Sequence, residues 1–132
     1  MMKVGIDLVR VERFEKMADC PEKQTKIFNA EEVEYIKSKK GANVKSFKKF
    51  ATICYTTAGL YACKEAVLKA LGVGINKGTS LTDVFVSHDK MGACVILLKG
   101  KAERLFKAGG FNEICANISH DGEYATAICV IN

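Results

Sequence analysis

The stretch YACKEAVLKALGVG (residues 61–74) decides the fold, because it combines an apolar helical pattern with charges placed inside it. Alanine and leucine are frequent in it and favour a helix. Gly72 follows the last of these residues, and glycine suits the left-handed position that ends a helix. Only Lys64, Glu65 and Lys69 carry charge. The stretch therefore predicts the C-terminal part of a buried helix that carries three charged side chains.

Outward from this helix, the flanking sequence predicts strands towards both ends of the chain and several shorter helices. In chain order we expect a strand over 2–9, a helix beginning near 9, a short helix through 26, a helix capped by Asn29, a long helix within 44–71 with a kink or break near 56–59, strands over 81–86 and 93–98, a helix over 100–108, and strands over 113–119 and 124–131. This order predicts an α+β fold with an antiparallel sheet and helices packed on it. We expect residues 1–132 to form a single domain, since a chain of this length holds one core.

The composition restricts the class of protein. The chain has 132 residues, of which 48% are hydrophobic and 27% charged, with one proline. These values are typical of a globular domain rather than a disordered chain. No run approaches the roughly 20 apolar residues of a membrane helix, and the N-terminus has no apolar signal region. We therefore expect a cytoplasmic protein whose six cysteines stay reduced.

The formal net charge is +5, and the basic residues are clustered. One cluster lies in residues 10–16, and a second, of six lysines, lies in residues 37–49. Such clusters favour an anionic partner, which can be a nucleic acid, a phosphorylated small molecule or an acidic protein. A solvated lysine face explains the second cluster equally well. Few aromatic residues lie among these lysines, so stacking on single-stranded nucleic acid is not favoured.

Two carboxylates indicate a metal site. Asp7 follows the core of the first predicted strand, where its ordinary role is to cap a helix. Glu65 and Lys69 lie four residues apart on a helix, where an exposed ion pair contributes only about 0.3–0.5 kcal/mol. A carboxylate within apolar surroundings, however, is costly unless a cation compensates it. Because Mg²⁺ is held by one or two carboxylates together with phosphate oxygens, Asp7 and Glu65 indicate phosphoryl chemistry.

Other residues fit such a site. Lys64 and Lys69 can neutralise phosphate charge, and the loop of Gly72 and Gly74 can bring its backbone close to a ligand. His120, in the sequence SHD, can contact a phosphate or carry a proton, although a histidine hydrogen-bonded within a turn is the commoner case. A Ser-His-Asp triad is not favoured, since neighbours in sequence rarely converge in that geometry.

Three segments together resemble a known family. GIDLVRVERF (5–14), KEAVLKALGVGI (64–75) and ANISHDGEYATA (116–127) are similar to the holo-acyl-carrier-protein synthases, the short bacterial-type 4′-phosphopantetheinyl transferases. The resemblance implies the fold of that family, a homotrimer with sites between protomers, and a role in fatty acid biosynthesis. It also implies a Mg²⁺-dependent transfer of phosphopantetheine from coenzyme A to a serine of apo-acyl carrier protein, which releases adenosine 3′,5′-bisphosphate.

The resemblance assigns roles to particular residues. It implies that Asp7 and Glu65 hold Mg²⁺, and that Glu65, directly or through a metal-bound water, takes the serine proton beside a catalytic Lys69. The residues implied to bind coenzyme A are Lys64, Lys69, Gly72, Gly74 and His120. Those implied to contact the acidic carrier protein are Arg13, Lys16 and Lys23, of which Arg13 lies at a typical contact position.

Two positions depart from the family pattern. Leu60 stands in TAGLYACKEA, where the family usually has an arginine in an AGRxxAKEA context. That arginine is expected to help hold a phosphate of the coenzyme, so Leu60 predicts weaker binding or a substitute cation. The turn of HDKMGACVILL (88–98) replaces an NGKP-like turn. Neither departure touches the pair of carboxylates.

Two other functions are compatible with the same residues. A basic module that binds RNA or another polyanion would use the lysines of residues 37–49 and would be indifferent to Mg²⁺. A Mg²⁺-dependent phosphohydrolase, such as a nuclease or pyrophosphatase, would use Asp7 and Glu65 without a carrier protein, although such sites often carry more carboxylates for a second metal. The transferase explains all the clusters together, so we expect no nucleic acid and no membrane as partner.

Overall fold

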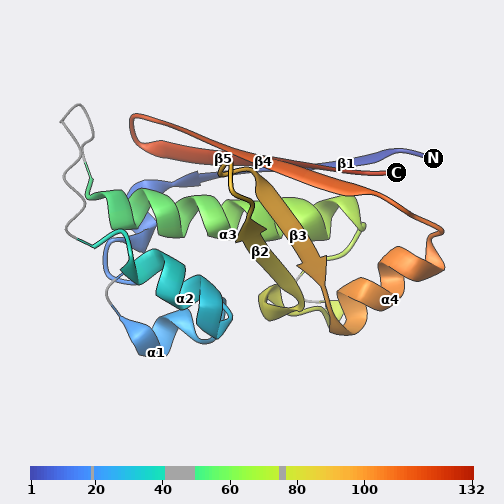
Figure 1. Ribbon diagram of the computed structural model, residues 1–132, viewed down its shortest axis with the longest axis horizontal. Coiled ribbons are helices and arrows are strands. Elements are labelled where there is room, and N and C mark those ends of the chain that lie inside the picture. The colour runs from blue at the N-terminus through green and yellow to red at the C-terminus, as the bar shows by residue number, and fades with distance from the viewer. Residues whose placement is uncertain (19, 41–49, 75–76) are drawn as a thin grey trace.

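The computed structural model describes residues 1–18, 20–40, 50–74 and 77–132, and has the expected α+β architecture (Figure 1). Its elements are β1 (Lys3–Arg10), the 3₁₀ turn η1 (Val11–Phe14), α1 (Pro21–Gln24), α2 (Ala30–Lys37), α3 (Thr52–Ala70), the 3₁₀ turn η3 (Leu81–Asp83), β2 (Val84–His88), β3 (Cys94–Leu98), α4 (Gly100–Ala108), β4 (Ile114–Asp121) and β5 (Tyr124–Ile131).

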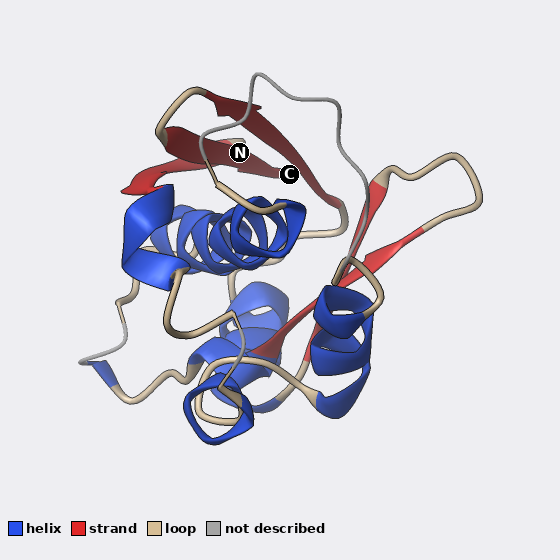
Figure 2. Cartoon of the chain, turned by 90° about the vertical axis from the view of Figure 1, so that its left-hand side faces the viewer, coloured by secondary structure: helices blue, strands red, loops and turns tan. Residues whose placement is uncertain are grey.

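The strands form two antiparallel sheets. The first has the order β1-β5-β4, with Asp7 level with Ala127 of β5, which is in turn level with Ile118 of β4. The second is the hairpin of β2 and β3. Figures 1 and 2 show α3 between the three-stranded sheet on one side and α1, α2, the hairpin and α4 on the other. The long helix therefore forms the centre of the molecule.

A glycine allows β1 to pack closely on α3. Alternate residues of β1 are turned towards the helix, so Gly5 and Val9 are buried while Ile6 is 62% exposed on the outer face. A Cβ at Gly5 would lie 1.9 Å from the carbonyl oxygen of Ala66. Because no side chain can occupy that space, glycine is required where the strand crosses the helix.

The helix α3 is continuous, so the break predicted near residues 56–59 is wrong. The hydroxyl groups of Thr56 and Thr57 donate to the carbonyl oxygens of Thr52 and Ile53 one turn earlier. These bonds satisfy the hydroxyls within the helix, and tertiary packing stabilises residues of poor helix propensity. Gly72 has a φ of 78°, as expected for the residue that follows the helix.

Other element boundaries differ locally. Instead of a helix from residue 9, β1 continues to Arg10, and only the 3₁₀ turn follows, because the N–H of Val11 still donates to the carbonyl of Glu123. The hairpin begins at Val84 rather than 81, since Ser80 caps the preceding 3₁₀ turn. The helix over 100–108 is confirmed, as are the strand over 124–131 and its partner. Three of the six lysines of the predicted cluster, Lys45, Lys48 and Lys49, lie outside the described residues.

The part of the chain that the structure describes holds no helix with both the length and the apolarity needed to cross a bilayer.

Candidate active site

Asp7 and Lys69 meet where β1 crosses the last turn of α3. The ammonium group of Lys69 lies 2.9 Å from Oδ1 of Asp7 and also donates to the carbonyl of Ile6 at 3.1 Å. Asp7 lies inside the strand, so the alternative in which it caps a helix is wrong. The Asp7 side chain is 13% exposed and that of Lys69 is 51% exposed. The pair therefore lies at the surface, with the carboxylate on its buried side.

The second carboxylate oxygen of Asp7 has no protein donor. Oδ2 is buried and accepts no hydrogen bond within the described structure. A buried carboxylate oxygen without a donor or a cation is energetically costly. The observation is the one expected of an oxygen that ligates a metal ion.

Glu65 lies within electrostatic reach of this oxygen. Burial raises the pKa of Glu65, and the negative charge of Asp7 raises it further. Lys69, a hydrogen bond from Tyr61 and the charge of Arg13 act in the opposite direction on the same pKa. Two carboxylates that repel each other at a partly buried position are the arrangement that a divalent cation relieves.

These two carboxylates fit Mg²⁺ as part of a coordination sphere. Among the described residues, no three or more histidine, cysteine or acidic side chains gather at one point. Asp7 and Glu65 can therefore supply two ligands, and the remaining ones would be phosphate oxygens and water. This division is usual for Mg²⁺ at substrate phosphates.

The expectation for Lys64 requires a correction. Its ammonium group is fully buried and lies 2.7 Å from Oε1 of Glu32, which is also fully buried. It further donates to the carbonyl oxygens of Leu81 and Val84. Lys64 therefore points into the core, and the structure offers no path from this ammonium group to a coenzyme phosphate. Glu32 was not among the predicted site residues, because its position three residues after Asn29 is typical of a capping box, which the structure also shows.

The two glycines after α3 lie close to Lys69. The N–H of Gly72 donates to the carbonyl of Lys69, and the carbonyl of Gly74 accepts the hydroxyl of Thr79 at 2.8 Å. A Cβ at either glycine would meet no atom within 4 Å. The loop therefore presents open backbone beside Lys69, as the prediction for Gly72 and Gly74 requires.

His120 lies on β4, on the same side of the sheet as α3. Its Nε2 lies 3.0 Å from the carbonyl oxygen of Tyr55, and its ring meets the Tyr55 ring edge-on. Gly59 makes room for it, since a Cβ there would lie 2.8 Å from Nε2. The residue is thus held against the N-terminal half of α3.

A hollow of about 210 Å³ brings His120 together with Leu60 and the turn of the hairpin. The wall contributed by the hairpin consists of His88, Gly92 and Cys94. The His88 ring stacks on Tyr35 of α2 with centroids 4.4 Å apart. His88 was not among the predicted site residues, because stacking with a residue 53 positions earlier leaves no local signal.

Asp7 and His120 do not meet within one chain. Both face α3, but β5 lies between β1 and β4, which separates the two side chains by about two strand spacings, roughly 10 Å. The structure therefore places the predicted metal ligands and His120 in two separate groups.

A third group contains the basic residues near the N-terminus. Arg13, Lys16 and Lys23 line one hollow of about 330 Å³, together with two glutamates and Met17. The guanidinium of Arg13 also lies over the ring of Tyr61, 5.6 Å from its centroid. Because Arg13 lies over Tyr61 and its charge acts on the pKa of Glu65, this basic hollow begins near Glu65.

Comparisons with known proteins identify the family of the chain. Residues 3–129 match the model of the 4′-phosphopantetheinyl transferase superfamily. The chain is 36% identical over 128 residues to a holo-[acyl-carrier-protein] synthase of Thermoanaerobacter sp. (strain X514), covering 96% of this chain and 84% of the relative.

Solved structures of the same kind superpose over nearly the whole chain. The Helicobacter pylori holo-[acyl-carrier-protein] synthase in complex with coenzyme A gives a TM-score of 0.75 at 29% identity, covering 98% of this chain and 99% of that one. A coenzyme A complex from Chronobacterium ammoniagenes gives 0.78 at 26% identity, covering 100% and 97%. This chain therefore belongs to the 4′-phosphopantetheinyl transferase superfamily and is an enzyme of that transferase class.

Proposed function

We propose that this enzyme transfers the 4′-phosphopantetheine group of coenzyme A to a serine of apo-acyl carrier protein and requires Mg²⁺. The observation that carries the proposal is the buried Oδ2 of Asp7, which lacks a donor while Glu65 lies within electrostatic reach. The relatives named as holo-[acyl-carrier-protein] synthases and the structures with coenzyme A support the choice of substrates.

Asp7, Glu65 and Lys69 would each have a separate role in the transfer. Asp7 and Glu65 hold the divalent cation, which supplies neutralisation of charge on the coenzyme pyrophosphate when it is bound. Lys69 fixes Asp7 through Oδ1, and its half-exposed ammonium group can also approach a phosphate oxygen. Glu65 takes the proton from the serine hydroxyl, either directly or through a bound water.

The transfer is a displacement at phosphorus. The serine oxygen forms a bond to the phosphorus that carries the pantetheine, and the bond from this phosphorus to the bridging oxygen of the pyrophosphate breaks. The leaving group is adenosine 3′,5′-bisphosphate. The hydroxyl proton passes to Glu65, so mass and charge balance.

Coenzyme A would contact two parts of the chain. Lys69 lies beside the carboxylates, where the pyrophosphate would bind, and the loop of Gly72 and Gly74 follows it in the chain. The hollow with Leu60 and His120 offers a second contact surface. Because these surfaces lie apart in one chain, we propose a homotrimer in which neighbouring protomers complete each site.

The outer face of the three-stranded sheet supports association between protomers. Val4, Ile6 and Leu8 of β1 and Ile128 of β5 are between 43% and 63% exposed on that face. Adjacent exposed apolar side chains of this kind are typical of interaction surfaces rather than of a face left to solvent.

The basic hollow would receive the carrier protein. Arg13, Lys16 and Lys23 face one concave surface that adjoins Glu65 through Tyr61, so an acidic partner bound there would present its serine near the carboxylates. We further propose that residues 1–132 act as one domain in the cytoplasm, in the service of fatty acid biosynthesis.

Intact-protein mass spectrometry tests the proposal. Apo-acyl carrier protein would be incubated with coenzyme A, Mg²⁺ and the enzyme, beside a sample with EDTA. The proposal predicts a mass gain of one phosphopantetheine that is absent with EDTA. Release of phosphate products from coenzyme A without a change in the carrier would favour the phosphohydrolase instead.

A further inference from the structure

A buried ion pair joins three elements next to the candidate site. The side chains of Glu32 on α2 and Lys64 on α3 are both 0% exposed. Lys64 directly precedes Glu65, but its side chain is turned to the opposite side, towards η3 and β2. Neither Glu32 nor Lys64 takes part in the proposed transfer.

Both oxygens of Glu32 are engaged. Oε1 accepts the N–H of Asn29 at 2.8 Å and the ammonium group of Lys64 at 2.7 Å. Oε2 accepts the N–H of Val86, in the middle of β2, also at 2.8 Å. One carboxylate thus binds its own helix, the central helix and the hairpin.

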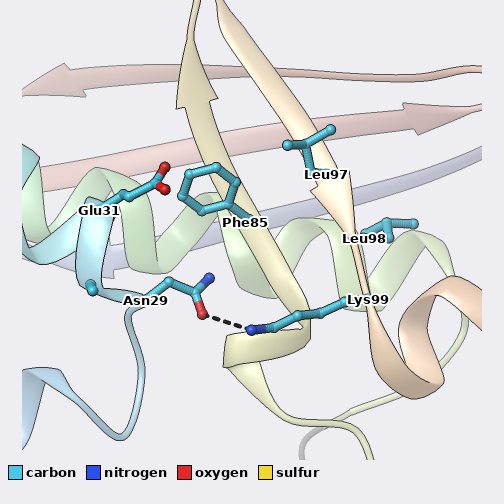
Figure 3. A pocket seen from close by; sticks show the side chains of 7 residues that line it. Asn29, Glu31, Phe85, Leu97, Leu98 and Lys99 are labelled. Carbon is cyan, nitrogen blue, oxygen red and sulfur yellow. Dashed lines mark hydrogen bonds between the residues drawn. The ribbon is translucent and has the colours of Figure 1, made fainter.

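Further contacts between α2 and the hairpin lie on either side of Glu32. Tyr35, three residues later on α2, stacks on His88, two residues after Val86. At the other end, the ammonium group of Lys99 donates to Oδ1 of Asn29 at 3.1 Å (Figure 3). The Lys99 contact is exposed and therefore weak, whereas the bonds of Glu32 to Val86 and Lys64 are buried.

The hairpin carries one wall of the hollow that contains Leu60 and His120. Its residues His88, Gly92 and Cys94 face α3 across that hollow. The bond from Val86 to Glu32 holds the strand immediately before His88. The distance between the two walls is therefore set through Glu32 and Lys64.

Stability alone does not require charge at this position. A buried ion pair loses so much hydration that apolar side chains of similar volume stabilise a fold equally well or better. Apolar side chains, however, cannot accept the N–H of Val86 and thereby fix the register of the hairpin against α2. The charged pair differs from apolar side chains in that it fixes the position of the hairpin against α2.

We infer that Glu32, acting with Lys64, is a positioning residue that holds the hairpin wall of the coenzyme A hollow at a fixed distance from α3. The inference rests on the proposed function, because it identifies that hollow as part of the coenzyme site.

Glu32→Gln tests this role selectively. The amide oxygen can still accept from Lys64 and Asn29, but the NH₂ group cannot accept the N–H of Val86. The matched control is Glu31→Gln, the same change at the adjacent, exposed residue of α2. We expect the KM for coenzyme A to rise about tenfold in Glu32→Gln, with kcat and the KM for carrier protein within about twofold of wild type. Glu31→Gln should match the wild type in all three.

The double variant Glu32→Leu with Lys64→Met removes both charges without leaving one of them unpaired. We expect it to melt below the wild type, because the buried N–H of Val86 loses its acceptor, and, where it is folded, to bind coenzyme A about tenfold more weakly, as measured by calorimetry. Wild-type affinity in either folded variant would overturn the inference, and if the double variant does not fold, Glu32→Gln decides. If the wild type itself bound no coenzyme A, the proposed function would fail and this inference with it.

Discussion

The ammonium group of Lys69 lies 2.9 Å from Oδ1 of Asp7, although 62 residues separate the two in the sequence. This contact joins the first strand to the end of the central helix, and it leaves Oδ2 of Asp7 buried without a donor. The lysine satisfies one oxygen of the carboxylate and leaves the other for a cation shared with Glu65. The proposed chemistry depends on this difference between the two carboxylate oxygens of Asp7.

Glu65→Gln should abolish most of the transfer activity while the fold is retained. The change removes a charged metal ligand and the proposed base, so kcat/KM should fall by about 10² or more. Initial rates of carrier-protein modification at saturating Mg²⁺ measure the effect, with Glu103→Gln on α4 as the control. Near-wild-type turnover in Glu65→Gln would exclude the role given to this residue.

Asp7→Asn should reduce activity in a way that added Mg²⁺ partly restores. Asparagine keeps an oxygen ligand but loses the charge that favours the cation, so the Mg²⁺ concentration at half-maximal rate should rise. The melting temperature should change little, because the exposed ammonium group of Lys69 makes a screened ion pair. An unchanged Mg²⁺ dependence would argue against Asp7 as a ligand.

The encounter with carrier protein should depend on salt. Arg13, Lys16 and Lys23 line one hollow, and opposite charge on the partner would accelerate association at low ionic strength. We expect kcat/KM for carrier protein to fall as salt rises, and to fall less steeply in Lys16→Gln than in the control Lys107→Gln. Parallel salt profiles for both variants would place the carrier elsewhere.

His88 should make the enzyme sensitive to mild acid. Burial and the nearby charge of Lys39 lower the pKa of His88 below its ordinary value, against a smaller opposing effect of Asp89. The unfolded chain then binds a proton at His88 more readily than the folded chain does. The free energy of unfolding therefore decreases as the pH falls from about 6.5 to the lower pKa of His88 in the folded state. Thermal melts of His88→Asn should show a weaker loss between pH 7 and 5 than wild type. Identical pH profiles would contradict this expectation.

The fold followed from the sequence wherever a pattern is local. The helix over 100–108 is amphipathic and ends at a glycine, and the strand over 124–131 alternates buried and exposed residues, so both were predicted at their observed boundaries. The continuous α3 was not foreseen, because the hydroxyls of Thr56 and Thr57 bond within the helix and tertiary packing outweighs their low propensity.

The candidate site, like the fold, could be predicted from the sequence only in part. Glu65 was predicted from its apolar surroundings and Asp7 from its place at the end of the first predicted strand, and their role as metal ligands stays a prediction. The buried position of Lys64 was not predicted, because a lysine beside a glutamate on a helix carries no sign of which side is buried. Its partner Glu32 lies 32 residues earlier and stands in a capping pattern that explains only one of its contacts. Such pairings depend on how elements pack, which local spacing does not encode.

Binding of Mn²⁺, a paramagnetic substitute for Mg²⁺, tests the central claim most directly. Electron paramagnetic resonance would measure free Mn²⁺ in titrations of the wild type, Asp7→Asn and Glu65→Gln, each with and without coenzyme A. We predict one site per chain in the wild type that tightens when coenzyme A is present and is lost or much weakened in both variants. Equal Mn²⁺ binding by all three proteins would contradict the assignment of Asp7 and Glu65 as metal ligands.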